Sequence, residues 1–264
     1  MIAEDLAALG LTSADLVQIC FAFMLVLART GAAMALLPGI GEAVAPSIVR
    51  AGLAFCIALL VLPGVRLSVP PVPDSGLVAG AAVMAEVVTG LWFGWLARVW
   101  VQTLAVAAQF IAYLLGISSV LQPDAELGPQ STALARLFDL AAPLIVLMSG
   151  LYMLPLRALD GLYRVIPPGS LLPAAASVQT AVGVVAETFS LALQLASPFV
   201  VASVVWHVAI GLTSRLVPRM QIYFVSMPGQ ILGGTLLLAV SVGTMLTAWQ
   251  EAVRAGLAAA FGTG

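Results

Sequence analysis

An all-α membrane protein is the fold class that the sequence predicts, and three observations support it. Of the 264 residues, 62% are hydrophobic and 8% are charged, whereas a soluble domain carries about 25% charged residues. Residues 188–214 and 220–250 contain no Asp, Glu, Lys or Arg, and a helix of ~20 apolar residues crosses a ~30 Å hydrocarbon layer. These runs lack the alternation of a barrel strand, so helices are expected.

Seven apolar segments are candidates for helices at membrane depth. Their expected bounds are 16–38, 48–65, 76–97, 99–121, 134–156, 178–213 and 221–249. Thr12 and Asp15 resemble a capping box ahead of the first segment. The connection 215–219 carries two Arg between the two longest runs, which places it on the cytoplasmic side.

Proline and glycine mark the expected breaks between these segments. Pro38 and Gly39 close the first segment. Pro63-Gly64 and the proline-rich stretch 70–73 predict a stiff connection, because proline fixes φ and lacks an N–H donor. Residues 122–130 form the most polar interior stretch, and residues 167–169 end a short amphipathic piece.

Three charged residues, Arg29, Glu86 and Glu187, fall inside apolar runs. A charge at the bilayer centre costs about 2.5–3.5 kcal/mol on insertion scales, so these side chains are expected to be buried. They could pair with one another or with carbonyl groups, they could line a functional pathway, or partner subunits could cover them. Hydropathy alone does not separate these three interpretations.

Motifs for enzymatic chemistry are missing from the sequence. There is no G-x-x-x-x-G-K-[ST] nucleotide cradle and no H-E-x-x-H zinc motif, and the single histidine, His207, has no second histidine with which to share a metal. Ser118 or Ser119 with His207 could suggest an intramembrane protease, but serines in membrane helices more often bond backbone groups. No catalytic, cofactor or metal site is predicted. The net charge of −2 argues against a nucleic-acid partner.

Two features suggest helix packing and a polar passage. Gly76, Gly80, Gly90 and Gly94 follow small-x-x-x-small spacing, which lets a second helix approach closely. An uncharged run from residue 102 leads into the Pro/Gly-rich stretch that ends at residue 130. Irregular polar backbone at membrane depth is tolerated where it is buried in protein or lines a watery cavity. An ordinary exposed connection between two spans is the alternative.

The order of residues along the chain resembles the FliR/SctT family, the export-gate subunit of the flagellar and injectisome type III secretion systems. Matching positions run over nearly the whole length: Arg29 with Pro38-Gly39, Pro46 and Arg50; Glu86 with Gly90 and Gly94; residues 107–109 through Gly116 to Pro123; Gly150 with Pro167; and Pro198, residues 211–215, Pro218 and Pro228. Three positions depart from the family pattern. Ala108 stands for Gly, Gln122 stands for Asp before Pro123, and Gln221 stands for Asn.

This resemblance implies a structural gate subunit and no enzyme. Broken helices and helical hairpins would pack with FliP-type and FliQ-type subunits in a helical export-gate assembly, beside FlhB-type and FlhA-type components, in the bacterial inner membrane at the base of a flagellum or injectisome. Residues 1–180 would form a FliP-like part and residues 181–264 a FliQ-like hairpin. The cargo would be secreted, unfolded proteins.

In the family, the segment matching residues 116–130 supplies a plug inside the closed channel. The resemblance therefore assigns a pore or plug role to Phe110, Tyr113, Gly116, Ser118, Ser119, Gln122, Pro123, Asp124 and Gly128. The rival interpretation is a secondary transporter or small-solute channel, since broken helices with buried charges also suit that class. Internal inverted repeats would favour the rival, and the sequence shows none.

Overall fold

The computed structural model describes residues 12–42, 46–116, 132–216 and 222–261. The described residues form helices and no strand, which confirms the predicted all-α class. In chain order the elements are α2 (Ser13–Leu36), α3 (Ser47–Val65), the 3₁₀ turn η1 (Arg66–Ser68), α4 (Gly76–Leu114), α5 (Ala133–Ser149), α6 (Met153–Val165), α7 (Ala174–Leu216) and α8 (Ile222–Phe261).

Five of these helices are long and apolar enough to cross a membrane. The candidate spans are Asp15–Leu36, Ser47–Ser68 (α3 with the turn η1), Gly76–Leu114, Ala174–Arg215 and Ser226–Phe261. Helices α5 and α6 pass the same test as a pair, with a bend of 76° between them, which is a broken span or a re-entrant loop. The expected segment 134–156 is therefore two helices.

Several local signals act as the sequence predicts, and others do not. The hydroxyl of Thr12 accepts a hydrogen bond from the Asp15 N–H, and the Asp15 carboxylate accepts one from the Thr12 N–H at 2.8 Å. This confirms the capping box. The predicted break between residues 97 and 99 was wrong, because α4 is one helix of 39 residues. The helix α3 ends at Val65, as the expected segment 48–65 does, so Pro63 lies inside the helix and not in the connection after it.

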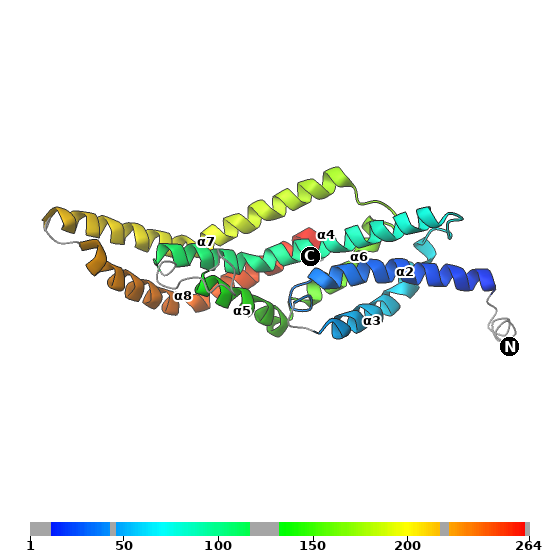
Figure 1. Ribbon diagram of the computed structural model, residues 1–264, viewed down its shortest axis with the longest axis horizontal. Helices are drawn as coiled ribbons and strands as arrows, with labels where there is room; N and C mark the ends of the chain where they lie inside the picture. The colour runs from blue at the N-terminus through cyan, green and yellow to red at the C-terminus, as the bar shows by residue number, and fades with distance from the viewer. Residues whose placement is uncertain (1–11, 43–45, 117–131, 217–221, 262–264) are drawn as a thin grey trace. The chain divides into compact units, whose positions relative to one another are not determined.

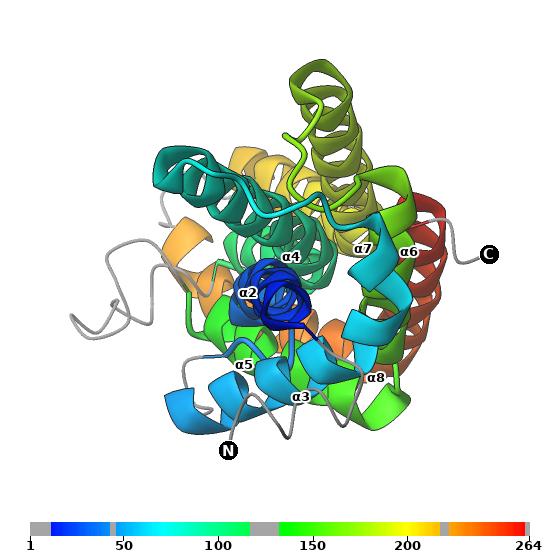
Figure 2. The ribbon, with the colours of Figure 1, turned by 90° about the vertical axis from the view of Figure 1, so that its right-hand side faces the viewer.

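The chain divides into two compact units, and the helices α4, α7 and α8 each contribute residues to both of them. The first comprises residues 1–98, 149–182 and 257–264, and the second comprises residues 99–148 and 183–256. Each unit therefore contains residues from both of the expected parts, 1–180 and 181–264. In the first unit, α2 lies between α3 and the N-terminal part of α4 (Figures 1 and 2). Phe21, Leu25 and Val26 of α2 form a core there with Ala58 of α3 and Tyr163 of α6.

The second unit has its own core, built on the C-terminal part of α4. Trp100, Leu104 and Ile111 are buried on one side of this helix, and Trp249 and Val253 of α8 are also buried. At Gly256 a side-chain carbon would overlap the Trp100 indole, so the absence of a side chain lets α8 lie against that ring. Helical periodicity thus supplies each unit with an apolar contact surface.

Candidate functional site

An ion pair at the centre of the first unit joins two of the charges that the sequence singles out. Arg29 on α2 and Glu86 on α4 both have 0% of their surface exposed. The Arg29 Nε lies 2.5 Å from Oε2 of Glu86, and Nη2 lies 3.0 Å from Oε1. This is the bidentate fork geometry that makes Arg–carboxylate pairs strong. Both residues fall inside apolar runs because each charge meets its counter-charge there.

The turn between α6 and α7 completes the hydrogen bonds of this pair. Arg29 Nη1 donates to the Ile166 carbonyl at 2.9 Å, and the Gly169 N–H donates to Glu86 Oε1 at 2.6 Å. Gly169 has φ +76°, a conformation that glycine adopts without strain. The Tyr163 ring lies under the guanidinium, 4.2 Å from ring centroid to Cζ. The pair is therefore enclosed on all sides and acts as a structural tie between α2, α4 and this turn.

Glu187 differs from the other two charges, because nothing in the described part of this chain covers it. It is exposed on α7, although its place in an apolar run predicted burial. The reason is that α7 turns many of its apolar residues outward as well, among them Val185 at 45% and Phe189 at 52% exposure. In α7, therefore, a residue that lies in an apolar run is not necessarily buried within this chain.

The four predicted packing glycines separate into two pairs. At Gly90 a side-chain carbon would overlap the Arg29 carbonyl oxygen, and at Gly94 it would lie 2.6 Å from the Ala33 carbonyl oxygen. These two glycines let α4 contact the backbone of α2 beside the ion pair. Gly76 and Gly80 have no atom within 4 Å of the same position. Within this chain α2 therefore meets Gly90 and Gly94, and a packing role for Gly76 and Gly80 stays a prediction.

The end of α4, where the predicted plug segment begins, is held by α8. Gln230 Nε2 donates to the Leu114 carbonyl at 2.9 Å. At Gly234 a side chain would overlap Leu115, so α8 packs closely at this point. Gly116 has φ +72°, the left-handed conformation with which glycine commonly ends a helix. Sequence reasoning missed Gln230, whose only signal is an amide in an uncharged run that also contains Gln221 and Gln250.

The far end of the same segment is tied back to α4. Gln109 Oε1 accepts hydrogen bonds from both the N–H and the hydroxyl of Thr132, each at 3.1 Å. The Thr132 hydroxyl also accepts from the Ala135 N–H at 3.2 Å, which caps the start of α5. Both ends of the interval 117–131 are thus fixed, one through Gln230 and the other through Gln109.

The remaining predicted pore residues fall into two groups. Phe110 is half-buried, with its ring edge-on to Phe189 at 5.8 Å between centroids, and Tyr113 is 57% exposed. The predicted positions Ser118, Ser119, Gln122, Pro123, Asp124 and Gly128 lie outside the described residues.

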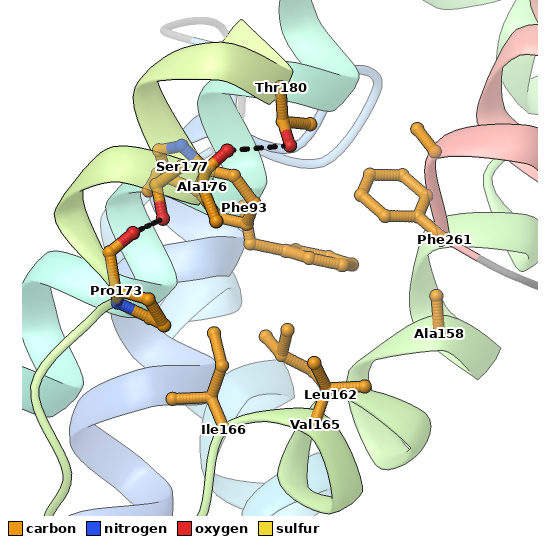
Figure 3. Close-up of a pocket in the computed structure, with 12 residues that line it drawn as sticks. Phe93, Ala158, Leu162, Val165, Ile166, Pro173, Ala176, Ser177, Thr180 and Phe261 are labelled. Carbon is orange, nitrogen blue, oxygen red and sulfur yellow. Dashed lines mark hydrogen bonds between the residues drawn. The ribbon is translucent and has the colours of Figure 1, made fainter.

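The first unit contains an apolar pocket of about 330 Å³ (Figure 3). Phe93, Phe261 and Ile166 line it, and the two hydroxyls at its edge are already occupied. Ser177 donates to the Pro173 carbonyl at 2.8 Å, and Thr180 donates to the Ala176 carbonyl at 2.9 Å. The pocket therefore offers neither a nucleophile nor a charged group to a polar substrate.

Metal-binding and protease chemistry also find no support in the described parts of the chain. Among those residues no group of three His, Cys, Asp or Glu side chains lies close enough to hold a metal ion. His207 Nδ1 lies 2.7 Å from the Ser203 carbonyl oxygen of its own helix. The arrangement that the described residues do provide is mechanical: a buried tie in one unit and fixed segment ends in the other.

Comparison with known proteins identifies the family to which the chain belongs. The profile of the bacterial export proteins, family 1, matches residues 20–256. The flagellar biosynthetic protein FliR of Caulobacter vibrioides is 33% identical over 230 residues, covering 87% of this chain and 92% of that protein. FliR of Bacillus subtilis is 25% identical over 235 residues, with 85% and 87% covered, and FliR of Aquifex aeolicus is 23% identical over 206 residues, with 78% and 79% covered. The chain therefore belongs to family 1 of the bacterial export proteins.

Proposed function

We propose that this chain is a structural and gating subunit of a type III protein-export channel, which passes unfolded proteins across the bacterial inner membrane. The observation that carries this proposal is the family match over residues 20–256, together with relatives named for flagellar biosynthesis. Five helices long enough to span a membrane are consistent with an embedded subunit. The secondary-transporter alternative is not favoured, since the family is one of export proteins.

The gating mechanism that we propose is steric. In the closed state, residues 116–130 lie across the lumen, and apolar side chains such as Phe110 beneath them resist wetting, as narrow apolar constrictions do. The anchors support this proposal, because a plug needs a fixed base. Gln230 holds Leu114 at one end, and Gln109 holds Thr132 at the other. The proposed mechanism breaks and forms no covalent bond.

The partners follow from membership in an export apparatus. We propose that FliP-type and FliQ-type subunits surround the chain and that FlhB-type and FlhA-type components adjoin it. Residues 1–180 take a FliP-like place and residues 181–264 a FliQ-like place. Exposed apolar residues support the need for neighbours: in α8, for example, Leu232, Leu236 and Val240 are at least 65% exposed. Large exposed apolar areas mark contact with other proteins or with lipid.

The plug is tested by ion conductance through the assembled complex. A deletion of residues 118–128 should raise the conductance of purified complexes in planar bilayers, because it removes the obstruction. A matched variant, in which a Gly/Ser sequence of equal length replaces these residues, shows whether chain bulk alone is sufficient. Unchanged conductance in the deletion variant would refute the plug.

The subunit role is tested by copurification. A tagged chain extracted from native membranes should bring different, untagged membrane subunits with it, and native mass spectrometry should count them. A small-solute carrier would instead be stable alone or as a homo-oligomer. Recovery of the chain as a stable monomer that lacks partners would contradict the proposed function.

A further inference from the structure

A polar stripe runs along the otherwise apolar helix α7. Its members are Gly183, Glu187, Ser190, Gln194 and Ser197, and they alternate in steps of four and three residues. This is the spacing of one seam in a helix that packs against another helix. The four members of this stripe that carry polar side chains, from Glu187 to Ser197, are exposed. A different stripe packs inside the second unit, and it consists of Val184, Thr188, Ala192, Leu195 and Phe199. The polar stripe is therefore a separate face of α7. We call it the α7 seam.

The neighbouring face of α7 indicates that this stretch does not lie in bulk water. Val185, Phe189 and Leu193 are 45%, 52% and 45% exposed, beside a carboxylate on the same turns. A charged side chain facing lipid is strongly disfavoured, and membrane carboxylates face a partner group or a watery cavity. The surface that covers Glu187 must therefore be polar, although it lies within an apolar surrounding.

The hydrogen bonds along the seam determine what such a surface must supply. Gln194 Nε2 donates to Ser190 Oγ at 3.3 Å, and Ser197 Oγ donates to the Gln194 carbonyl at 2.7 Å. These donors are satisfied along α7 itself. Glu187 receives no hydrogen bond or ion pair from the described residues, so its carboxylate is an outward-facing acceptor. A complementary surface must bring a donor, and a cation suits a carboxylate best.

Residue size favours a helix over a water-filled passage. Gly183, Ser190 and Ser197 recur every seven residues, which is the repeat of one seam between paired helices. Small residues at such an interface let a second helix approach closely. Glu187 and Gln194 occupy the intervening positions, where polar side chains fix the register of paired helices. A watery lumen imposes no such alternation of small and long side chains.

We propose that the α7 seam docks one membrane helix of a different subunit, and that this helix presents an Arg or Lys to Glu187. Small residues of the seam admit the partner backbone, and the ion pair sets the register. The proposal rests on the proposed function only in treating the chain as one subunit of a hetero-oligomer.

The test uses the intact complex purified from membranes, in a chain whose Cys20 and Cys56 are replaced by Ser. Ser190→Cys and Ser197→Cys report on the seam, and Leu193→Cys on the exposed apolar face is the matched control. Seam thiols should react with a hydrophilic maleimide at least about tenfold more slowly in the complex than after dissociation in SDS. Labelling in the complex as fast as in SDS would mean a watery passage and would overturn the proposal.

A second measurement identifies the occupant. Diazirine amino acids at positions 190 and 197 should cross-link to a single partner subunit, and the cross-linked peptide should contain an Arg or Lys within a membrane helix. The same probe at position 193 should give a different pattern. Cross-links from the seam to lipid alone, or to a helix without a cation, would overturn the proposal.

Charge substitution tests the ion pair directly. Glu187→Arg should lower recovery of the complex at least about tenfold, because it places like charges together. Glu187→Gln should retain most of the recovery of the complex. Replacing the identified Arg or Lys of the partner helix by Glu should restore the recovery of the complex that contains Glu187→Arg. Equal recovery of the Arg and Gln variants would contradict the pair. If the unsubstituted chain copurified with no other subunit, the proposed function itself would fail, which is a distinguishable result.

Discussion

Breaking the buried ion pair should be the most damaging single change in the first unit. Arg29→Met leaves Glu86 in a site with 0% exposure and with Gly169 as its remaining described donor. Removing one partner of a buried pair costs about 3–5 kcal/mol, because the other charge stays buried and unpaired. Glu86→Leu should cost a similar amount, since it strands the guanidinium between Ile166 and Tyr163.

The double variant Arg29→Met/Glu86→Leu should cost less than the sum of the two single changes. It removes both charges and leaves the Ile166 carbonyl and the Gly169 N–H without these partners, at about 1–3 kcal/mol each. The two single changes together would cost about 6–10 kcal/mol. From the middle of each range, about 8 kcal/mol for the two single changes and about 4 kcal/mol for the double variant, the double-mutant cycle should show a coupling of a few kcal/mol.

Thiol protection in the assembled complex measures these costs. A reporter Ala58→Cys, in a chain without its native cysteines, is buried in the core of the first unit. Its labelling rate reports local opening, and a loss of 3–5 kcal/mol accelerates labelling by about a hundredfold or more. The control Arg136→Met breaks an exposed pair on α5 and should change the rate less than about threefold. Additive single changes, or an Arg29 effect no larger than the control, would refute the reasoning.

Three further predictions concern close contacts and segment ends. Gly90→Ala should destabilise the first unit by about 1–3 kcal/mol by overpacking. Gly80→Ala places a side-chain carbon that meets nothing within 4 Å, so it should be neutral or slightly stabilising. The same thiol assay compares the two variants. Gln230→Leu removes the donor to the Leu114 carbonyl and should increase hydrogen exchange at the end of α4, with unchanged exchange there as the contrary result. Thr132→Val removes the α5 cap and should cost about 1 kcal/mol, seen as faster exchange at the start of α5; protection equal to the unsubstituted chain would speak against the cap.

The helical class and several helix ends could be predicted because their causes are local. Thr12 and Asp15 lie three residues apart, so the capping box is visible in the sequence and present in the structure. Pro63 shows the limit of such signals. Proline disfavours a helix interior, yet α3 continues through Pro63 to Val65. A local preference of this size can be outweighed by packing, which the sequence does not display.

The candidate site was only partly predictable for a related reason. Arg29 and Glu86 stand out in the sequence as charges among apolar residues, but nothing local indicates that they pair with each other. Gln230 and Thr132 carry no such signal, because single polar residues are common in membrane helices and bond their own backbone there. Their roles depend on contacts with residues 116 and 23 positions away in the chain.

The sequence by itself determined that this protein is a set of apolar helices without enzymatic motifs, because composition and periodicity follow from the solvent that each segment meets. Tertiary structure decided which charges are satisfied. Arg29 reaches Glu86 across 57 residues and Ile166 across 137, while Glu187, in an equally apolar run, is exposed. Satisfying a charge depends on distances of a few ångströms between helices, and those distances are set by packing rather than by order along the chain.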